Sequence, residues 1–233
     1  MKKILAVLVA AALLFAGGAA ALRGAGYRAS EDARQKMEAG ETNGRITAFL
    51  PEEIRAGLIF YPGALVEHAA YAPLMEMLSA RGILCLLVQM PLDLAVFDPD
   101  AAQGLQQQYP QVEKWIISGH SLGGAMAAQH AAKHTNAYDG LLLLGAYSAA
   151  DLSAADLSVF SVYGSEDGVL NREKYEAYRT HVPAAFEELV IDGGCHAFFG
   201  DYGPQKGDGE PMISRELQMG ITASAVSAWI DTL

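Results

Sequence analysis

The sequence has little cysteine and little positive charge. Its 233 residues include two cysteines, Cys85 and Cys195, which are too few for a disulfide framework. We expect no bridge between them, because Cys85 lies inside an apolar run and should pack as a small buried hydrophobe. The 16 Lys and Arg residues stand against 27 Asp and Glu residues, so the net charge is -11. This balance argues against nucleic acid and anionic membrane surfaces as partners and fits a small-molecule substrate better.

Motifs for metal and nucleotide binding are also missing. The sequence has no C-x-x-C. His130 and His134 have the spacing of a helical ligand pair, but no glutamate follows His130 as in H-E-x-x-H. There is no G-x-G-x-x-G, and the glycine-rich stretch Gly200–Gly209 is acidic and follows no strand–turn–helix pattern. We therefore predict neither a metal site nor a cofactor.

One long apolar run, Ile4–Leu22, follows Lys2 and Lys3. As a membrane anchor it is long enough to span a bilayer, which takes about 20 residues. As a cleaved signal peptide it would be cut at the small residues Ala19–Ala21. We favour the anchor, since the apolar character continues past that point. The lysines before the run place the rest of the chain outside the cytoplasm. Both interpretations predict an exported protein of the cell envelope, with the membrane as a partner if the segment is uncleaved.

The chain divides into three parts on this evidence. Residues 1–26 form the anchor or signal peptide, residues 27–44 a spacer or short helix, and residues 45–233 one domain. No internal repeat, low-complexity tract or linker interrupts the last part. The sequence gives no prediction of oligomeric state.

Short apolar runs alternate with helical patterns along this domain, which is typical of a parallel sheet covered on both faces. We predict an α/β fold, a doubly wound and mostly parallel sheet with helices on both faces. The expected strands are Ile46–Phe49, Ala56–Tyr61, Ile83–Val88, Lys114–Ser118, Gly140–Leu144, Ser158–Tyr163 and Phe186–Ile191. The expected helices are Glu67–Ala80, Ala101–Tyr109, Leu122–His134, Arg172–Thr180 and Ile213–Thr232.

The most informative motif is the G-x-S-x-G sequence centred on Ser121. The apolar run Trp115–Ile117 precedes it and the alanine-rich run Ala125–Ala132 follows it. This context indicates strand, sharp turn and helix, an arrangement that exposes the serine hydroxyl at the end of the strand. The flanking glycines allow neighbouring backbone to pass close to the turn. We predict Ser121 as a nucleophile.

A serine nucleophile needs a base and an acid that orients the base. Asp167 follows the expected strand that ends at Tyr163, and His196 follows the one that ends at Ile191. The carboxyl ends of parallel strands share one edge of a sheet, so both side chains should lie near Ser121, in the chain order serine, acid, histidine. Glu166 is the rival acid. His196 is the one histidine of the six on the expected loop.

An oxyanion needs two N–H donors aimed at the developing charge. Leu122, the residue after the nucleophile, supplies the first. The second is expected from the loop after strand Ala56–Tyr61, with the Ala64 N–H as the candidate and Leu65 as the alternative. Three further side chains are candidates for substrate binding or for structural roles: Glu67, Tyr71 and Phe198.

The sequence resembles the alpha/beta-hydrolase superfamily in three segments: GHSLGG, GSEDG and GGCHAFFGDYG. More narrowly, it is similar to small single-domain bacterial hydrolases related to dienelactone hydrolases, usually with an N-terminal membrane segment. The matching pieces are YPGALVEHAAYAPL, VQMPLDLAVFD, GHSLGGAMAA and HAFFGDYGPQKGDG. The resemblance implies a serine hydrolase with Ser121 as nucleophile, Asp167 as acid and His196 as base. Dienelactone hydrolases proper carry cysteine as the nucleophile, whereas this chain has Ser121.

The stretch 145–157 between two expected strands leaves no room for the cap domain that such hydrolases often insert there. We therefore expect a fairly open cleft and a small or medium carboxylic ester as substrate. The same triad would also serve a thioesterase, an amidase or peptidase, or an acyltransferase, because fold and triad do not distinguish these activities. A non-catalytic binding module at the cell surface is the alternative of a different class.

Overall fold

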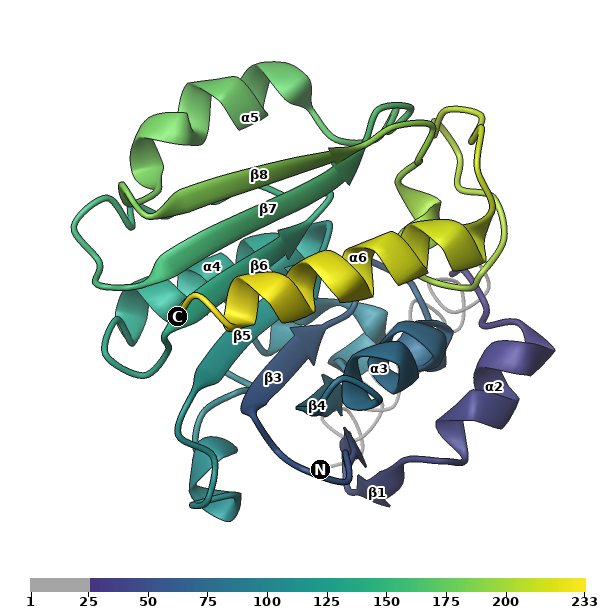
Figure 1. The fold of residues 1–233 in the computed structure, drawn as a ribbon. Helices are drawn as coiled ribbons and strands as arrows, with labels where there is room; N and C mark the ends of the chain where they lie inside the picture. Colours follow the sequence, from purple (N-terminus) through teal and green to yellow (C-terminus); the bar gives the residue numbers. More distant parts are fainter. Residues whose placement is uncertain (1–25) are drawn as a thin grey trace, which may run out of the picture.

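The computed structural model describes residues 26–233 (Figure 1). The apolar run Ile4–Leu22, and with it the predicted anchor or signal peptide, lies outside the described residues. Between residues 26 and 233, no helix combines the length and the apolar character needed to cross a membrane.

The domain is built on one eight-stranded sheet with the strand order β1-β2-β4-β3-β5-β6-β7-β8. Strands β3 to β8 pair in parallel, and β1 and β2 run antiparallel at one edge. Every residue of β3, β4 and β5 is buried, because helices or loops cover both faces of these strands. The seven predicted strands correspond to β2 to β8, which confirms the predicted fold class. The strands are β1 (Glu41–Asn43), β2 (Ile46–Phe49), β3 (Ala56–Tyr61), β4 (Ile83–Val88), β5 (Trp115–His120), β6 (Gly140–Leu144), β7 (Ser158–Gly164) and β8 (Phe186–Ile191).

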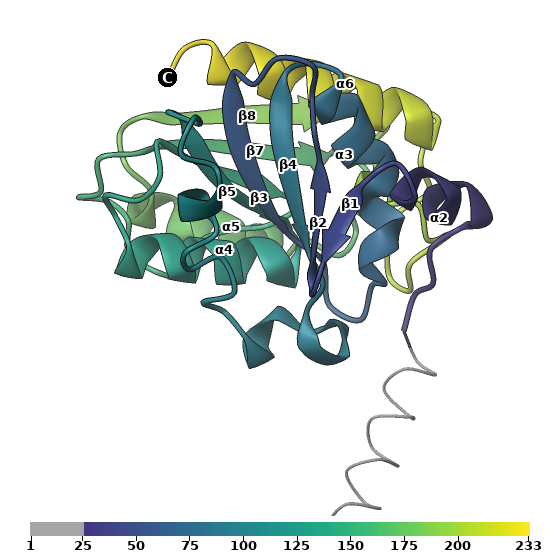
Figure 2. The same cartoon turned by 90° about the horizontal axis from the view of Figure 1, so that it is seen from below.

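Helices cover the sheet on both sides. Figure 2 shows α2, α3 and α6 on one face and α4 and α5 on the other. Each face carries its own apolar cluster, one centred on β3, α3 and α6 and the other on β5, β6 and α4. The helices are α2 (Glu31–Met37), α3 (Ala72–Ser79), α4 (Leu122–Lys133), α5 (Arg172–Ala177) and α6 (Arg215–Ile230). Short 3-10 turns are η1 (His68–Tyr71), η2 (Pro91–Asp93), η3 (Ala95–Phe97), η4 (Gln106–Gln108), η5 (Tyr178–His181) and η6 (Ala197–Phe199).

Residues 27–44, predicted as a spacer or short helix, contain the short helix α2 and pack on the domain. Tyr27 forms a parallel bridge with Val66, and its N–H donates to the Leu65 carbonyl at 2.7 Å. The hydroxyl of Ser30 caps α2, and Ala33 on that helix is fully buried. A small residue such as alanine lets a helix approach its neighbour closely without a long apolar run. The segment therefore joins the domain through a few contacts that the apolar pattern does not display.

The predicted helix Ala101–Tyr109 is wrong: this stretch forms turns, with helical geometry only at η4. Gly104 has a φ of 80°, which ends any regular helix there. The hydroxyl of Tyr61 accepts the Ala102 N–H at 2.7 Å. The side-chain amide of Gln106 donates to the Ala137 carbonyl at 2.6 Å. Contacts distant in sequence thus replace the hydrogen bonds that a helix would have made.

Candidate active site

Ser121 lies between the last residue of β5 and the first residue of α4. Its φ of 53° and ψ of -124° are unusual for a residue with a side chain and mark a strained turn. The turn is tight: a Cβ on Gly119 would lie 2.5 Å from the Gly123 backbone, and one on Gly123 would lie 2.2 Å from the Tyr61 carbonyl oxygen. The glycines of the motif are therefore required by the close approach of three chain segments.

Asp167 and His196 meet where β7 and β8 end. Nδ1 of His196 lies 2.8 Å from Oδ2 of Asp167, and both side chains are buried. The other carboxylate oxygen accepts the N–H groups of Val169 at 2.9 Å and Leu170 at 2.8 Å, so the loop itself orients Asp167. A carboxylate only accepts, which places the proton of the neutral imidazole on Nδ1 and leaves Nε2 as an acceptor. Nε2 of His196 is buried and has no hydrogen-bond partner among the described residues.

The structure brings Ser121 and His196 to one cavity at the carboxyl edge of the sheet. The cavity has a volume of about 230 Å³. Apolar side chains make up most of its wall. The other lining residues are Leu122, Ala125, Gly145, Ala146, Tyr147, Val169, Leu170 and Asn171.

The rival acid Glu166 makes different contacts. Its carboxylate accepts from the Ser165 hydroxyl at 2.9 Å, and its N–H donates to the Gly194 carbonyl at 2.8 Å. The carboxylate that the structure brings to His196 is that of Asp167.

Hydrogen bonds within the loop after β3 exclude some of its N–H groups as candidate oxyanion donors. The Leu65 N–H donates to the Asp93 carbonyl at 2.7 Å, so it is already engaged. The Gly63 N–H donates to the Tyr71 hydroxyl at 3.0 Å. In the described part of the chain, the N–H groups of Ala64 and Leu122 donate to no acceptor. On this loop, the N–H of Ala64 is thus the candidate oxyanion donor that is left. The Leu122 N–H at the start of α4 is the other candidate.

Two of the candidate substrate-binding residues, Glu67 and Phe198, do not line the cavity. Glu67 pairs with Arg34 at 2.8 Å and accepts the Ala29 N–H at 3.1 Å. Phe198 lies beneath Arg215, whose guanidinium carbon is 5.0 Å from the ring centroid. Both side chains thus hold other parts of the chain against the domain, which is one of the two roles that the sequence allowed.

The third candidate, Tyr71, is fully buried and also lies away from the cavity wall. Its hydroxyl accepts the Gly63 N–H, so it donates to Nδ1 of His120, 2.8 Å away. The ring of His120, the residue before Ser121, lies 4.4 Å from the ring of His196, centroid to centroid. Burial, and then the proximity of His196, hold the pKa of His120 well below its ordinary value of 6.5. His120 is therefore a neutral ring packed beside His196.

Sequence reasoning missed Gly145, which directly follows β6. Its φ is 52°, and a Cβ at this position would lie 2.8 Å from Nδ1 of His196 and 3.1 Å from Oδ2 of Asp167. The glycine leaves the space in which the acid and the histidine meet. A glycine immediately after a strand at the carboxyl edge was the signal that could have identified it.

Both cysteines are buried and free. Burial raises the pKa of the Cys85 thiol. Burial and the charge of Asp208 raise the pKa of Cys195 to about 12. Since the thiolate is the reactive form, this raised pKa disfavours Cys195 as a nucleophile at neutral pH, although the residue adjoins His196.

Asp100, His130 and His134 bring their donor atoms within 4.8 Å of one another. His130 is buried, and protein groups satisfy both of its ring nitrogens. Nδ1 lies 3.0 Å from Asp100 and Nε2 lies 3.0 Å from the Tyr138 hydroxyl. The ammonium of Lys133 lies 3.1 Å from Asp100. These contacts tie α4 to the loop before β5, and the positive charge of Lys133 disfavours a cation there.

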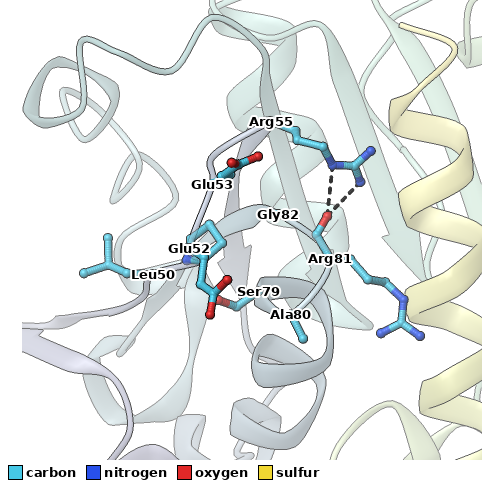
Figure 3. A pocket seen from close by; sticks show the side chains of 9 residues that line it. Leu50, Glu52, Glu53, Arg55, Ser79, Ala80, Arg81 and Gly82 are labelled. Atoms are coloured by element: carbon cyan, nitrogen blue, oxygen red, sulfur yellow. Dashed lines mark hydrogen bonds between the residues drawn. The ribbon is translucent and has the colours of Figure 1, made fainter.

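A larger cavity of about 580 Å³ lies where β3 and β4 begin, at the opposite edge of the sheet from Ser121. Figure 3 shows its walls, which come from residues 50–55 and 79–82. Nε and Nη2 of Arg55 donate to the Arg81 carbonyl at 3.0 and 2.7 Å. Its guanidinium thus closes one side of the cavity, and the groups predicted for catalysis lie elsewhere.

A model of the alpha/beta hydrolase family matches residues 57–220, which run from β3 into α6. The chain belongs to the alpha/beta hydrolase family. The family is one of hydrolases, which is the class predicted from the sequence. The match does not extend to the narrower resemblance to dienelactone hydrolases. No curated protein matches the sequence.

Several solved structures resemble this chain over most of its length. Est1E from Butyrivibrio proteoclasticus is 16% identical, with a TM-score of 0.58, and the match covers 83% of this chain and 96% of that one. A soluble variant of monoglyceride lipase from Saccharomyces cerevisiae is 12% identical, with a TM-score of 0.59 and coverage of 82% and 93%. A dienelactone hydrolase-like promiscuous phosphotriesterase from metagenomic libraries is 16% identical, with a TM-score of 0.60 and coverage of 81% and 92%. At these identities the likeness shows a common fold.

Proposed function

We propose that the protein is a serine hydrolase that cleaves small or medium carboxylic esters, with Ser121 as nucleophile, His196 as base and Asp167 as the orienting acid. One observation carries this proposal. Asp167 holds Nδ1 of His196 at 2.8 Å, while Nε2 is buried without a described partner, and His196 shares a cavity with Ser121. A base with one nitrogen fixed and the other ready to accept suits proton transfer from a serine.

In the acylation step, Nε2 of His196 takes the proton of the Ser121 hydroxyl as its oxygen attacks the ester carbonyl. The carbonyl oxygen becomes negatively charged, and the N–H groups of Leu122 and Ala64 stabilise it. Asp167 stabilises the imidazolium that forms. The imidazolium then gives its proton to the leaving alcohol, and the acyl group stays on Ser121.

Deacylation repeats these steps with water. His196 takes a proton from a water molecule, whose oxygen attacks the acyl carbon. The tetrahedral intermediate collapses, the acid is released, and the proton returns to Ser121.

The cavity supports a small acyl group. Its volume of about 230 Å³ is below the roughly 300–1,000 Å³ of most ligand pockets, and its walls are mostly apolar. The connection from β6 to β7, residues 145–157, carries no helix or strand that would act as a cap. A short, uncharged acyl chain fits these walls best. Hydrolysis rates that fall steeply as the acyl chain is shortened would contradict this substrate class.

The test uses the full-length chain in mild detergent, treated with a fluorophosphonate probe and analysed by intact mass. We expect one adduct on the parent and none on Ser121→Ala. The exposed Ser153→Ala serves as the control and should keep the adduct. Ester turnover by Ser121→Ala should fall by about 10⁴-fold or more. A folded parent without an adduct would contradict the proposal and favour the binding-module alternative.

The same three residues, Ser121, His196 and Asp167, would also support alternative activities: thioesterase, amidase or peptidase, or acyltransferase. A panel of oxygen ester, thioester and amide with one common acyl group distinguishes them. We expect the highest kcat/KM for the oxygen ester. Added alcohol that diverts the acyl group into a new ester would identify an acyltransferase.

We also propose that the protein is exported and held at the membrane by its N-terminal apolar run. The sequence supports this, because the apolar run Ile4–Leu22 is long enough to span a bilayer and follows Lys2 and Lys3. Membrane fractionation with N-terminal sequencing of the mature protein tests it. An intact N-terminus in the membrane fraction is the expected result, whereas a soluble protein that begins after Ala21 would show a cleaved signal peptide.

A further inference from the structure

The carboxylate of Asp208 accepts hydrogen bonds from four main-chain N–H groups, and the Cys195 thiol also interacts with it. Oδ1 accepts from Gly168 at 3.2 Å, from His196 at 3.0 Å and from the following residue Gly209 at 2.9 Å. Oδ2 accepts from Ala197 at 2.8 Å. No lysine, arginine or histidine within the described residues forms an ion pair with Asp208. The sequence had suggested only an acidic, glycine-rich loop here.

The two loops that Asp208 joins are those of the proposed acid and base. Gly168 directly follows Asp167, and His196 is the base itself. One carboxylate oxygen thus accepts N–H groups from both loops. We infer that Asp208 is a positioning residue, which fixes the main chain of His196 relative to that of Asp167. This inference rests on the proposed function.

Glycines bring Asp208 within reach of both loops. A Cβ on Gly168 would lie 2.6 Å from the Gly207 carbonyl oxygen, and one on Gly209 would lie 2.1 Å from the Glu166 carbonyl oxygen. The main chain at 207–209 therefore lies directly against the main chain at 166–168. At this separation the short aspartate side chain reaches the main chain of both loops.

Other hydrogen bonds hold the two strands together without Asp208. The ladder between β7 and β8 extends to Gly164 and Ile191, and the Glu166 N–H donates to the Gly194 carbonyl at 2.8 Å. These bonds end before the histidine, whose own N–H is held by Asp208. Removal of the Asp208 carboxylate should therefore leave the fold in place while the His196 main chain gains freedom.

The experiment compares three variants of the full-length chain: Asp208→Ala, Asp208→Asn and Asp201→Asn. The last is a matched control, because Asp201 lies on the same loop but pairs with Arg215 and touches neither proposed catalytic residue. We measure kcat, KM and thermal midpoint with a short-chain ester. Asp208→Ala should lower kcat about 10- to 100-fold with KM changed less than about threefold, since misplacement of a base by about 1 Å has effects of this size.

Asp208→Asn should restore part of kcat but not all of it, because its amide oxygen can accept the bonds of Oδ1 whereas its NH2 group cannot accept the Ala197 N–H. Asp201→Asn should lower the thermal midpoint and leave kcat within about twofold of the parent, as expected for the loss of a stabilising ion pair. If Asp208→Ala also lowers only the thermal midpoint, the inference is overturned. If Asp208→Ala does not fold, a parent-like kcat in Asp208→Asn overturns it instead.

A second readout follows the acid–base pair directly. The proton on Nδ1 of His196 should give a proton NMR signal far downfield of the amide region in the parent and in Asp201→Asn. We expect the signal to broaden or vanish in Asp208→Ala, and a sharp parent-like signal would contradict the inference. This signal does not depend on turnover. Failure of the proposed function, seen as full activity in Ser121→Ala, is thereby distinguished from failure of the role of Asp208.

Discussion

The imidazole rings of His120 and His196 lie against each other, with centroids 4.4 Å apart and planes inclined by 46°. Burial keeps His120 neutral, because it holds the pKa of this histidine well below 6.5. A second charge at this distance would oppose the imidazolium that His196 must form during turnover. Packing a neutral ring there gives His196 a close, uncharged neighbour.

We expect the free energy of unfolding to fall as the pH is lowered from about 7.5 to about 5.5. Burial lowers the pKa of both His120 and His130 below 6.5. The unfolded chain therefore binds more protons than the folded chain below pH 6.5, so stability is full above this pH and is lost as the pH falls. Each histidine contributes a slope of at most about 1.4 kcal/mol per pH unit. Urea denaturation of the parent and of His130→Gln checks this, and equal slopes for the two proteins would contradict it.

Tyr71→Phe should reduce catalysis by disturbing the loop that carries Ala64. The hydroxyl accepts the Gly63 N–H and donates to His120, so its loss leaves two buried polar groups unsatisfied at about 1–3 kcal/mol each. We expect kcat/KM to fall about tenfold or more, mostly through kcat. Tyr138→Phe removes a comparable hydrogen bond to His130, away from the site. It should cost similar stability with kcat/KM near that of the parent, and equal losses of activity in both variants would refute this role of Tyr71.

Gly145→Ala should separate His196 from Asp167. The added Cβ would lie 2.8 Å from Nδ1 of His196, in a backbone conformation that favours glycine. We expect kcat to fall about 100-fold and the free energy of unfolding to fall by about 1–3 kcal/mol. Gly44→Ala is the matched control, since its φ is 59° and nothing lies within 4 Å of the new Cβ. Kinetics and denaturation of both variants should show a similar backbone cost but a loss of kcat in Gly145→Ala alone.

Ala125→Leu should narrow the cavity beside Ser121. Ala125 lines this cavity from the first turns of α4, so a leucine there would occupy space used by the acyl chain. We expect the ratio of butyrate to acetate ester hydrolysis to fall about tenfold or more, because single methylenes in apolar pockets have effects of this size. Ala132→Leu on the same helix, outside the cavity, should leave the ratio unchanged. An unchanged ratio in Ala125→Leu would place the acyl group elsewhere.

The sequence predicted the sheet well because burial on both faces leaves a local mark. Strands β3, β4 and β6 read as uninterrupted apolar runs, and their bounds are those expected. β1 was missed because it is a short, exposed edge strand with a polar sequence. The helix predicted over Ala101–Tyr109 failed because its local propensity competed with a glycine turn and with the distant Tyr61 and Ala137.

The sequence by itself determined the turn at Ser121 and the placement of Asp167 and His196 at one edge. Strand–turn–helix is a local pattern, and parallel strands must end on the same side of the sheet, so no distant contact had to be known. Only the tertiary structure decided that Gly145 leaves room for the acid–base pair, that Tyr71 reaches His120, and that Asp208 holds His196. These partners lie on segments far apart in the sequence. The packing of the whole sheet sets the distances between such segments, and a local sequence pattern does not encode those distances.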